Sequence, residues 1–308
     1  MDFTLSDDQQ LLRDTARGLL EKECPTSLVR AYQDDVSVAG RLWEHLLEWT
    51  ELGRGPLVDL CLFLEETGAV LAPGPFFASS VLWSGLELDG AGTVAFIDDI
   101  TMPYTIDADR VEHIAVVVPD GAVVTETSRL TLRPVQTIDW TRHLVEVSGS
   151  GDFDQPRPFD QAALLERAYV AIAAELLGTT RWLLQHTIEY AKERHQFDRP
   201  IGSFQAIQHK IAEMALAYEE AWGAVYYAAM CIDAGDDDRH RAAHVAKIMA
   251  GAAATRAAKD GIQVHGGIGY TWEHDLHLYI RRAYASEHLL GTSGWHHDRL
   301  AALLLDSR

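Results

Sequence analysis

Cysteine is scarce in this sequence of 308 residues: Cys24, Cys61 and Cys231 lie far apart, and no Cys-x-x-Cys pair occurs. That spacing argues against a disulfide framework and against a zinc ribbon. No apolar run is long enough to span a bilayer, and the acidic N-terminus lacks the basic-then-apolar pattern of a signal peptide. We therefore expect a cytoplasmic protein that does not enter a membrane.

Basic residues are also few, with 26 lysines and arginines against 46 aspartates and glutamates, which gives a net charge of -20. A chain this acidic is a poor partner for nucleic acid, because binding the phosphate backbone needs a basic surface. A small anionic cofactor is not excluded, since local arginines can bind phosphate within an acidic protein. The apolar share of 47% and the charged share of 23% are ordinary for a globular protein.

The residue pattern predicts a mainly α protein with a small β domain. Residues 1 to about 85 show helical periodicity, beginning at a capping box formed by Ser6 and Gln9 and broken at 73–75 by Pro-Gly-Pro. Between about 90 and 150, short β-branched runs separated by Asp, Gly and Pro predict a small antiparallel sheet with a turn at 119–121. Residues 148–158 form a predicted linker.

Helical periodicity returns after the linker, and short connections between long helices predict an antiparallel bundle. The acidic loop 233–238 ends in aspartates whose charge suits a helix N-terminus. We expect three units, at 1–88, 89–152 and 153–308. The predicted C-terminal helices are Gln161 to Glu193, Phe204 to Ile232, Arg239 to about Val264, Glu273 to about His288, and Trp295 to Leu305.

Two connections are unusual for a plain bundle. The first, 193–205, carries two arginines, a glutamine and a phenylalanine that can bind a phosphate and cover a flat ring. The second, 263–270, contains paired glycines that let backbone N–H groups approach a phosphate. Because these glycines follow a helix, they do not form a Rossmann fingerprint. Taken alone, each segment also reads as an ordinary turn at the end of a helix.

Together the two segments resemble the C-terminal domain of the acyl-CoA dehydrogenase family. "YAKERHQFDRPIGSFQAIQHKIAEM" and "GIQVHGGIGYTWEHDLHLYIRRA" are similar to that family's two FAD-binding segments in wording, order and separation. The opening "FTLSDDQQLLRDTARGLL" resembles the family's first helix. The resemblance is dense across about 160 to 292, fair across 1 to 85, and thin from 90 to 150. It implies the acyl-CoA dehydrogenase fold, with helical, strand and helical domains in that order.

The resemblance also implies FAD as cofactor, at a site that spans a subunit interface. Asp198 stands where the family usually has glycine, and puts a negative charge near the expected pyrophosphate. The residues that match the family's cofactor contacts are Arg194, Gln196 and Phe197, the packing residues Ile201, Phe204 and Ile207, and Gln263, Gly266 and Gly267, which meet FAD from a neighbouring subunit.

The family's reaction needs a carboxylate base that removes a proton next to the thioester carbonyl while a hydride passes to the flavin. One family position for this glutamate is a Tyr-Glu-Gly-Thr turn, which reads Leu289-Leu290-Gly291-Thr292 here. The other family position falls on Ala168. We therefore assign no catalytic residue. Glu166, Glu175 and Glu287 are weak candidates for a displaced base.

The strand region is short, and between Asp89 and Ser148 it lacks the family's Thr/Ser-bearing strand and its Trp-x-Ser/Thr segment; "TVAFIDD" is at most a remnant of the first. This combination resembles the short subunit of actinobacterial α2β2 acyl-CoA dehydrogenases, some of which act on steroid side-chain CoA thioesters. In such an assembly the partner subunit carries the base, and electrons pass on to an electron-transferring flavoprotein. Two alternatives stay open: a self-sufficient homo-oligomer with a displaced glutamate, and a flavin-free scaffold.

Histidines invite a metal site, because His274 and His277 are three residues apart and His296-His297 precede Asp298. Adjacent histidines point in different directions on a helix, and no ligand set of fixed geometry emerges. We therefore expect no metal. Aromatic residues at helical spacing are most simply core or subunit contacts: Trp182, Trp222, Tyr226 and Tyr227.

Overall fold

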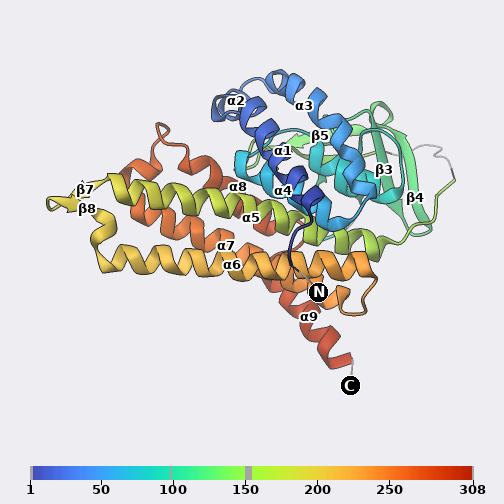
Figure 1. Ribbon diagram of the computed structural model, residues 1–308. Coiled ribbons are helices and arrows are strands. Elements are labelled where there is room, and N and C mark those ends of the chain that lie inside the picture. The colour runs from blue at the N-terminus through green and yellow to red at the C-terminus, as the bar shows by residue number, and fades with distance from the viewer. Residues whose placement is uncertain (1–2, 98, 150–154, 307–308) are drawn as a thin grey trace.

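The computed structural model describes residues 3–97, 99–149 and 155–306, and shows helices, then strands, then helices along the chain (Figure 1). Asp98 of "TVAFIDD" and residues 150–154 of the predicted linker lie outside the described residues. The N-terminal elements are α1 (Asp7–Glu23), α2 (Thr26–Ala31), η1 (Val36–Ala39), α3 (Gly40–Leu47), η2 (Glu48–Arg54), α4 (Leu57–Val70), the π-helix η3 (Ala78–Trp83) and η4 (Ser84–Leu86).

The predicted capping box is confirmed at the start of α1. The Ser6 hydroxyl accepts a hydrogen bond from the Gln9 backbone N–H, and the Gln9 side chain accepts one from the Ser6 N–H. The helix ends at Glu23, immediately before Cys24 and Pro25, since proline disfavours helix at the residue before it. Cys24 is a free thiol, as are Cys61 and Cys231.

Six strands form two three-stranded sheets, ordered β1-β3-β4 and β2-β6-β5. A hairpin joins β3 to β4 with Val118 opposite Gly121, which confirms the predicted turn. The expectation of one antiparallel sheet is wrong, because β1 pairs with β3 in parallel. The short β2 lies between them in sequence and joins the other sheet, so the chain must cross over before it returns. The strands are β1 (Gly92–Phe96), β2 (Thr105–Ile106), β3 (His113–Val118), β4 (Gly121–Glu126), β5 (Thr131–Val135) and β6 (Leu144–Ser148).

The C-terminal half is the predicted helical bundle. Its three long helices run side by side, with a small hairpin protruding at one end, and the last helix projects from the body (Figure 1). The elements are α5 (Gln161–Glu193), β7 (His195–Gln196), β8 (Arg199–Pro200), η6 (Ile201–Ser203), α6 (Gln205–Ala234), α7 (Arg239–His265), η7 (Gly266–Tyr270), α8 (Leu276–His288) and α9 (Ser293–Asp306). Within the described residues, no helix combines the length and apolarity that crossing a membrane requires.

Two glycines let α4 and α5 cross at close range. A Cβ atom on Gly68 would lie 1.9 Å from the carbonyl oxygen of Glu175, and one on Gly178 would lie 1.8 Å from that of Glu65. Side chains larger than hydrogen at either position would force the two helices apart. On the other side of α5, the buried face of α7 is mostly alanine, which allows similarly close packing: Ala242, Ala243, Ala246, Ala250, Ala253, Ala254, Ala257 and Ala258.

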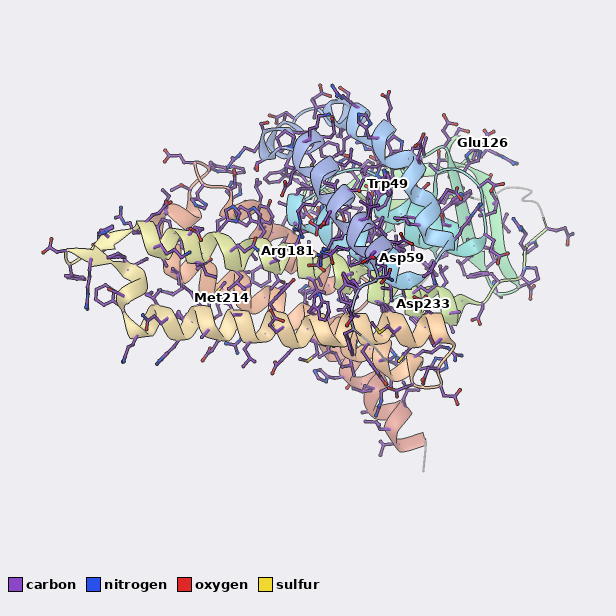
Figure 2. All side chains as sticks on the ribbon, in the orientation of Figure 1. Trp49, Asp59, Glu126, Arg181, Met214 and Asp233 are labelled. Carbon is purple, nitrogen blue, oxygen red and sulfur yellow. The ribbon has the colours of Figure 1, made fainter. Side chains whose placement is uncertain are left out.

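An ion-pair network joins the N-terminal helices to the bundle. Arg181 of α5 donates to Glu65 and to Glu66 on α4, each at 2.6 Å, and Arg17 of α1 donates to Glu66 at 2.8 Å. Arg181 lies where these helices meet (Figure 2). The fully buried Tyr226 hydroxyl donates to Glu65 at 2.9 Å. Burial raises the pKa of Glu65, so these donors are needed to hold its charge.

The acidic loop caps a distant helix. Asp233 accepts hydrogen bonds from the backbone N–H groups of Leu57 and Val58, at 2.6 and 3.0 Å, and thereby caps α4 from the end of α6 (Figure 2). We expect Asp233→Ala to lower the free energy of unfolding by about 1 to 2 kcal/mol, because two N–H donors lose a charged acceptor. Urea unfolding followed by circular dichroism measures this. Asp237→Ala, an exposed change in the same loop, is the matched control; an equal loss in both variants would contradict the capping role.

Candidate functional site

The β7–β8 hairpin presents the first predicted cofactor segment. Its two turn residues, Phe197 and Asp198, have φ angles of 54° and 62°, a left-handed conformation that costs non-glycine residues free energy. Phe197 is 86% exposed, and Arg194 and Gln196 are exposed as well. The sequence thus holds an apolar ring in solvent on a strained turn, which favours an interpretation as a binding feature over a simple connector.

The base of the hairpin is ordered by Phe204. The Arg199 guanidinium lies 4.1 Å from the centre of the Phe204 ring, and Phe197 meets the same ring edge-on at 6.1 Å. The Ile201 N–H donates to the Arg194 carbonyl at 2.7 Å, which fixes the backbone on both sides of the turn. The predicted packing residues Ile201, Phe204 and Ile207 are all half-buried.

The second predicted segment lies at the same end of the bundle. There α7 ends at His265, the following Gly266 has a φ of 62°, and Gln263 and Gly267 are exposed. A Cβ atom on Gly266 or Gly267 would meet nothing within 4 Å, so the backbone of this turn is open to a ligand. This openness fits a diphosphate that approaches the backbone N–H groups.

Tyr190 and His265 join the two segments. The Tyr190 hydroxyl donates to the His265 carbonyl at 3.3 Å, and their rings stack with centres 4.2 Å apart. Tyr190 also accepts, through its carbonyl, the hydrogen bond from the Arg194 N–H that ends α5. The structure therefore brings all nine predicted cofactor residues to one end of the bundle. No pattern in the sequence singles out this aromatic pair.

Leu290 occupies the expected position of the base. Its side chain is fully buried, and its φ of 61° shows that the turn keeps a conformation unusual for leucine. The His296 Nε2–H donates to the Leu290 carbonyl at 3.0 Å. Lys247 donates to the carbonyls of Glu287 and Gly291, at 2.7 and 3.2 Å. The turn is thus well held but presents no carboxylate.

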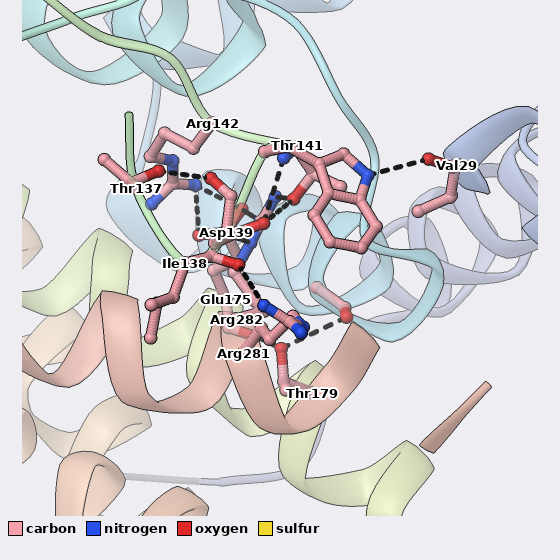
Figure 3. A network of polar contacts seen from close by, with 12 residues as sticks. Val29, Thr137, Ile138, Asp139, Thr141, Arg142, Glu175, Thr179, Arg281 and Arg282 are labelled. Carbon is pink, nitrogen blue, oxygen red and sulfur yellow. Dashed lines mark hydrogen bonds and ion pairs between the residues drawn. The ribbon is translucent and has the colours of Figure 1, made fainter. Parts of the chain in front are cut away.

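Glu175 is engaged in a buried network of charged groups (Figure 3). Arg142, from the loop before β6, donates to it at 2.7 Å, and Arg282 of α8 donates at 2.9 Å. Arg282 also donates to Asp139 at 2.6 Å. Burial alone would raise the pKa of Asp139, but the Arg282 guanidinium holds it below its usual value. Glu175 is therefore engaged in ion pairs with two guanidiniums inside the fold.

The other two candidate carboxylates are also engaged. Glu166 makes a short contact with His240 Nδ1 and lies 3.7 Å from the Arg239 guanidinium. Glu287 accepts from the Ser293 N–H at 2.9 Å and from its hydroxyl at 2.8 Å, at the start of α9. Burial alone would raise the pKa of Glu287, yet the bonds from Ser293 hold it below its usual value.

A small cavity lies next to the turn that contains Leu290. Arg142, Ser286 and Leu289 line a cavity of about 30 Å³ there, which is room for about one water molecule. Sites for small molecules are usually several hundred Å³. The Arg142 guanidinium lies 4.8 Å from the centre of the Phe77 ring, so the network itself occupies the gap between the β domain and the helices. In β1, the Thr93 hydroxyl donates to the Ile106 carbonyl and is not available to a cofactor.

A pair of histidines, the half-buried His244 and the buried His296, supports the turn at Leu290. The Nδ1 atoms of His244 and His296 lie 2.7 Å apart. Because His296 uses its Nε2–H on the Leu290 carbonyl, its Nδ1 accepts and His244 Nδ1–H donates. His296 is buried while His297 is exposed, so these adjacent residues do point apart. Among the described residues, no group of three or more histidine, cysteine or carboxylate side chains could hold a metal ion.

These histidines make stability depend on pH. Burial lowers the pKa of His296 to about 3 and that of His244 to about 4, so both stay neutral in the fold. Unfolded histidine titrates near pH 6.5, so their contribution is complete above that pH and is lost as the pH falls below it. We expect the free energy of unfolding to fall between pH 6.5 and 4 by up to about 1.4 kcal/mol per pH unit for each histidine. Urea unfolding at a series of pH values measures this slope. His296→Phe should reduce it, and a reduction of the same size in His297→Gln would contradict the assignment.

Comparisons with known proteins agree with this architecture. A family described as "Acyl-CoA dehydrogenase, C-terminal domain" matches residues 161–305. "Acyl-CoA dehydrogenase IpdE2" of Mycobacterium tuberculosis is 33% identical over 94% of this chain and 94% of its own length. The solved "Tcur3481-Tcur3483 steroid ACAD G363A variant" superposes with a TM-score of 0.85 at 23% identity, over 99% of both chains. The ChsE4-ChsE5 complex from Mycobacterium tuberculosis superposes with a TM-score of 0.84 at 20% identity, also over 99% of both chains. From its sequence relatives and its fold, this chain belongs to the acyl-CoA dehydrogenase family.

Proposed function

We propose that this chain is the flavin-completing subunit of a heteromeric acyl-CoA dehydrogenase in which a second subunit supplies the base. One observation carries the proposal: Leu290 is buried where the base would stand, and the cavity lined by its neighbour Leu289 holds only about 30 Å³. A chain with open cofactor segments, but with neither a carboxylate nor an acyl-sized cavity at this turn, is suited to complete a partner's site.

The predicted cofactor residues suit different parts of FAD. The exposed Arg194 guanidinium suits the diphosphate, and the Phe197 ring suits a flat face of FAD. Gln263 and the open backbone at Gly266 and Gly267 would contact the diphosphate from the other side. Bound flavin supplies the hydride acceptor for α,β-desaturation of the acyl-CoA thioester. This chain's own residues would bind its diphosphate and one face of its ring.

Two relatives bear on the substrate and the assembly. The Tcur3481-Tcur3483 protein is described as a steroid ACAD, and both it and ChsE4-ChsE5 pair two differently named chains. We therefore propose a steroid side-chain CoA thioester as the substrate, an α2β2 assembly with one FAD per pair of unlike subunits, and an electron-transferring flavoprotein as the acceptor.

Expression alone and in combination tests the proposal. The chain would be produced by itself, and then with an acyl-CoA dehydrogenase homologue of the same organism that carries the glutamate in its Tyr-Glu-Gly-Thr turn. Bound flavin and dehydrogenation of acyl-CoA should appear only in the mixed assembly. A yellow, active homo-oligomer of this chain would refute the proposal in favour of a displaced glutamate. If neither preparation contained flavin, the alternative of a flavin-free scaffold would be supported.

Glutamate variants locate the base within the active assembly. Glu166→Gln and Glu287→Gln should leave turnover within about twofold, because both carboxylates already serve internal contacts. Glutamine in place of the partner's turn glutamate should lower turnover by a factor of about 10² or more. A collapse of the rate in either variant of this chain would place the base here.

A further inference from the structure

The outward side of α8 carries an aromatic and cationic surface, which we call the α8 patch: Ile138, Trp140, Trp272, Arg281 and Tyr284. Trp272 is 57% exposed, Ile138 is 53% exposed and Tyr284 is 38% exposed. Tryptophan, tyrosine and arginine are the residue types that dominate the energetics of protein interfaces. Contiguous exposure of large apolar side chains on one face marks a binding surface more often than a solvated one.

The patch is pre-assembled from distant parts of the chain. Trp140 and Trp272 stack with ring centres 5.9 Å apart, and the Arg281 guanidinium lies 5.4 and 5.5 Å from the two rings. Arg281 also donates to the Ile138 carbonyl at 3.2 Å, a bond seen in Figure 3. Because these contacts already hold the side chains, little conformational entropy is lost when a partner binds.

The charge of the patch differs from that of the whole chain, whose net charge is -20. Arg281 forms no ion pair within the described part of the chain. Asp275, at the start of α8, is neutralised by Arg30 at 2.6 Å, which leaves the exposed Glu273 as the neighbouring carboxylate. Beneath Trp272 lies His277, whose two ring nitrogens are buried without a hydrogen-bond partner. The α8 patch therefore presents a cation and apolar rings to a binding partner.

We propose that the α8 patch docks the catalytic partner subunit, with a carboxylate of that subunit paired with Arg281. This inference rests on the proposed function. The patch is continuous with the segment that would meet the partner's FAD: Trp272 lies two residues after the end of η7, and Tyr270, 73% exposed, lies between it and Gly266–Gly267. A second copy of this chain is a poorer occupant, because two copies that each carry a net charge of -20 repel one another.

Dissociation constants of the FAD-loaded heteromer test the proposal, measured by sedimentation at a fixed salt concentration. Trp272→Ala and Arg281→Glu should each weaken association by about tenfold or more, as expected for central interface residues. Two changes on α1 are matched controls: Leu11→Ala, at 64% exposure, and Lys22→Glu, whose side chain is 75% exposed. Both should stay within about twofold of the unaltered protein. Thermal unfolding of each variant alone verifies the fold, and Tyr284→Ala provides a further probe at the edge of the patch.

The outcomes separate this inference from the function on which it rests. If the unaltered chain forms an active, yellow heteromer and Trp272→Ala and Arg281→Glu assemble with the same affinity, the α8 patch is not the docking surface. The proposed function would still stand. Failure of the unaltered chain to form any such heteromer overturns both. A homodimer that Arg281→Glu disrupts overturns the choice of occupant. A weaker heteromer in both patch variants, with both controls unchanged, supports the proposal.

Discussion

Glu175→Ala is expected to lower the free energy of unfolding by about 3 to 5 kcal/mol, because it leaves two buried guanidiniums without their shared carboxylate. Glu175 and Arg282 are 3% and 1% exposed, and Arg142 is 8% exposed, so water cannot easily replace the lost acceptor. Arg282 would retain Asp139, whereas Arg142 would lose its carboxylate partner. Urea unfolding followed by circular dichroism measures the loss.

Three further variants identify the cause of that loss. Glu175→Gln should be milder, because the amide oxygen can still accept one hydrogen bond. Removing Arg142 together with Glu175 should recover part of the loss, since the pair is coupled. Glu189→Ala on the same helix breaks an exposed pair with Lys192 and should cost no more than about 0.5 kcal/mol. If Glu175→Ala lowered the free energy of unfolding by less than about 1 kcal/mol, solvent would have to reach the network. That result would contradict the burial of the network.

Arg194→Ala is expected to weaken FAD binding to the assembled enzyme by about 10- to 100-fold, the usual cost of losing a charge-assisted bond to phosphate. Arg194 is exposed beside the strained turn and makes no ion pair within the described residues, so its guanidinium is available to a ligand. Flavin fluorescence on dilution of the heteromer gives the dissociation constant. Lys192→Ala, two residues earlier, is the control. Unchanged flavin content in Arg194→Ala would mean that the hairpin only connects two helices.

Asp198→Gly should change FAD binding in the opposite direction. Glycine adopts the φ of 62° without strain, and the change removes a negative charge from the turn. Tighter binding by about threefold to tenfold is the expected result for removing one like charge near a diphosphate. Asp198→Asn separates the two causes, because asparagine tolerates the left-handed conformation but carries no charge. Equal FAD affinity in the unaltered protein, Asp198→Gly and Asp198→Asn would show that the diphosphate does not lie near residue 198.

Local signals predicted most of the helical architecture. The predicted bounds of α5, Gln161 to Glu193, are the observed ones. Asp160 caps the start of the helix, and the charged connector follows its end. For α8 the predicted start at Glu273 is three residues early, because residues 273–275 form a turn before the helix begins. The parallel pairing of β1 with β3 could not be predicted, since short strands carry no mark of their neighbours.

For the candidate site, sequence resemblance identified which residues to consider but not what surrounds them. The absence of a base at Leu290 was visible from alignment alone. The buried network near this turn was not visible, because Glu175 and Asp139 meet Arg282 only through folding, across more than a hundred residues in both pairs. One signal was present: adjacent arginines on an amphipathic helix place one side chain toward the interior.

Through those adjacent arginines, α8 contributes both to the exposed α8 patch and to the buried network. Neighbouring residues on a helix point about 100° apart, and here Arg281 lies in the α8 patch while Arg282 enters the buried network. We expect occupancy of one face and integrity of the other to be linked, because Ile138 and Trp140 of the patch lie in the same loop as Asp139 and Arg142 of the network; such a linkage is reciprocal. A partner bound at Arg281 should slow amide hydrogen exchange in the 137–142 loop. Loosening that loop should, to the same extent in free energy, reduce the partner's affinity.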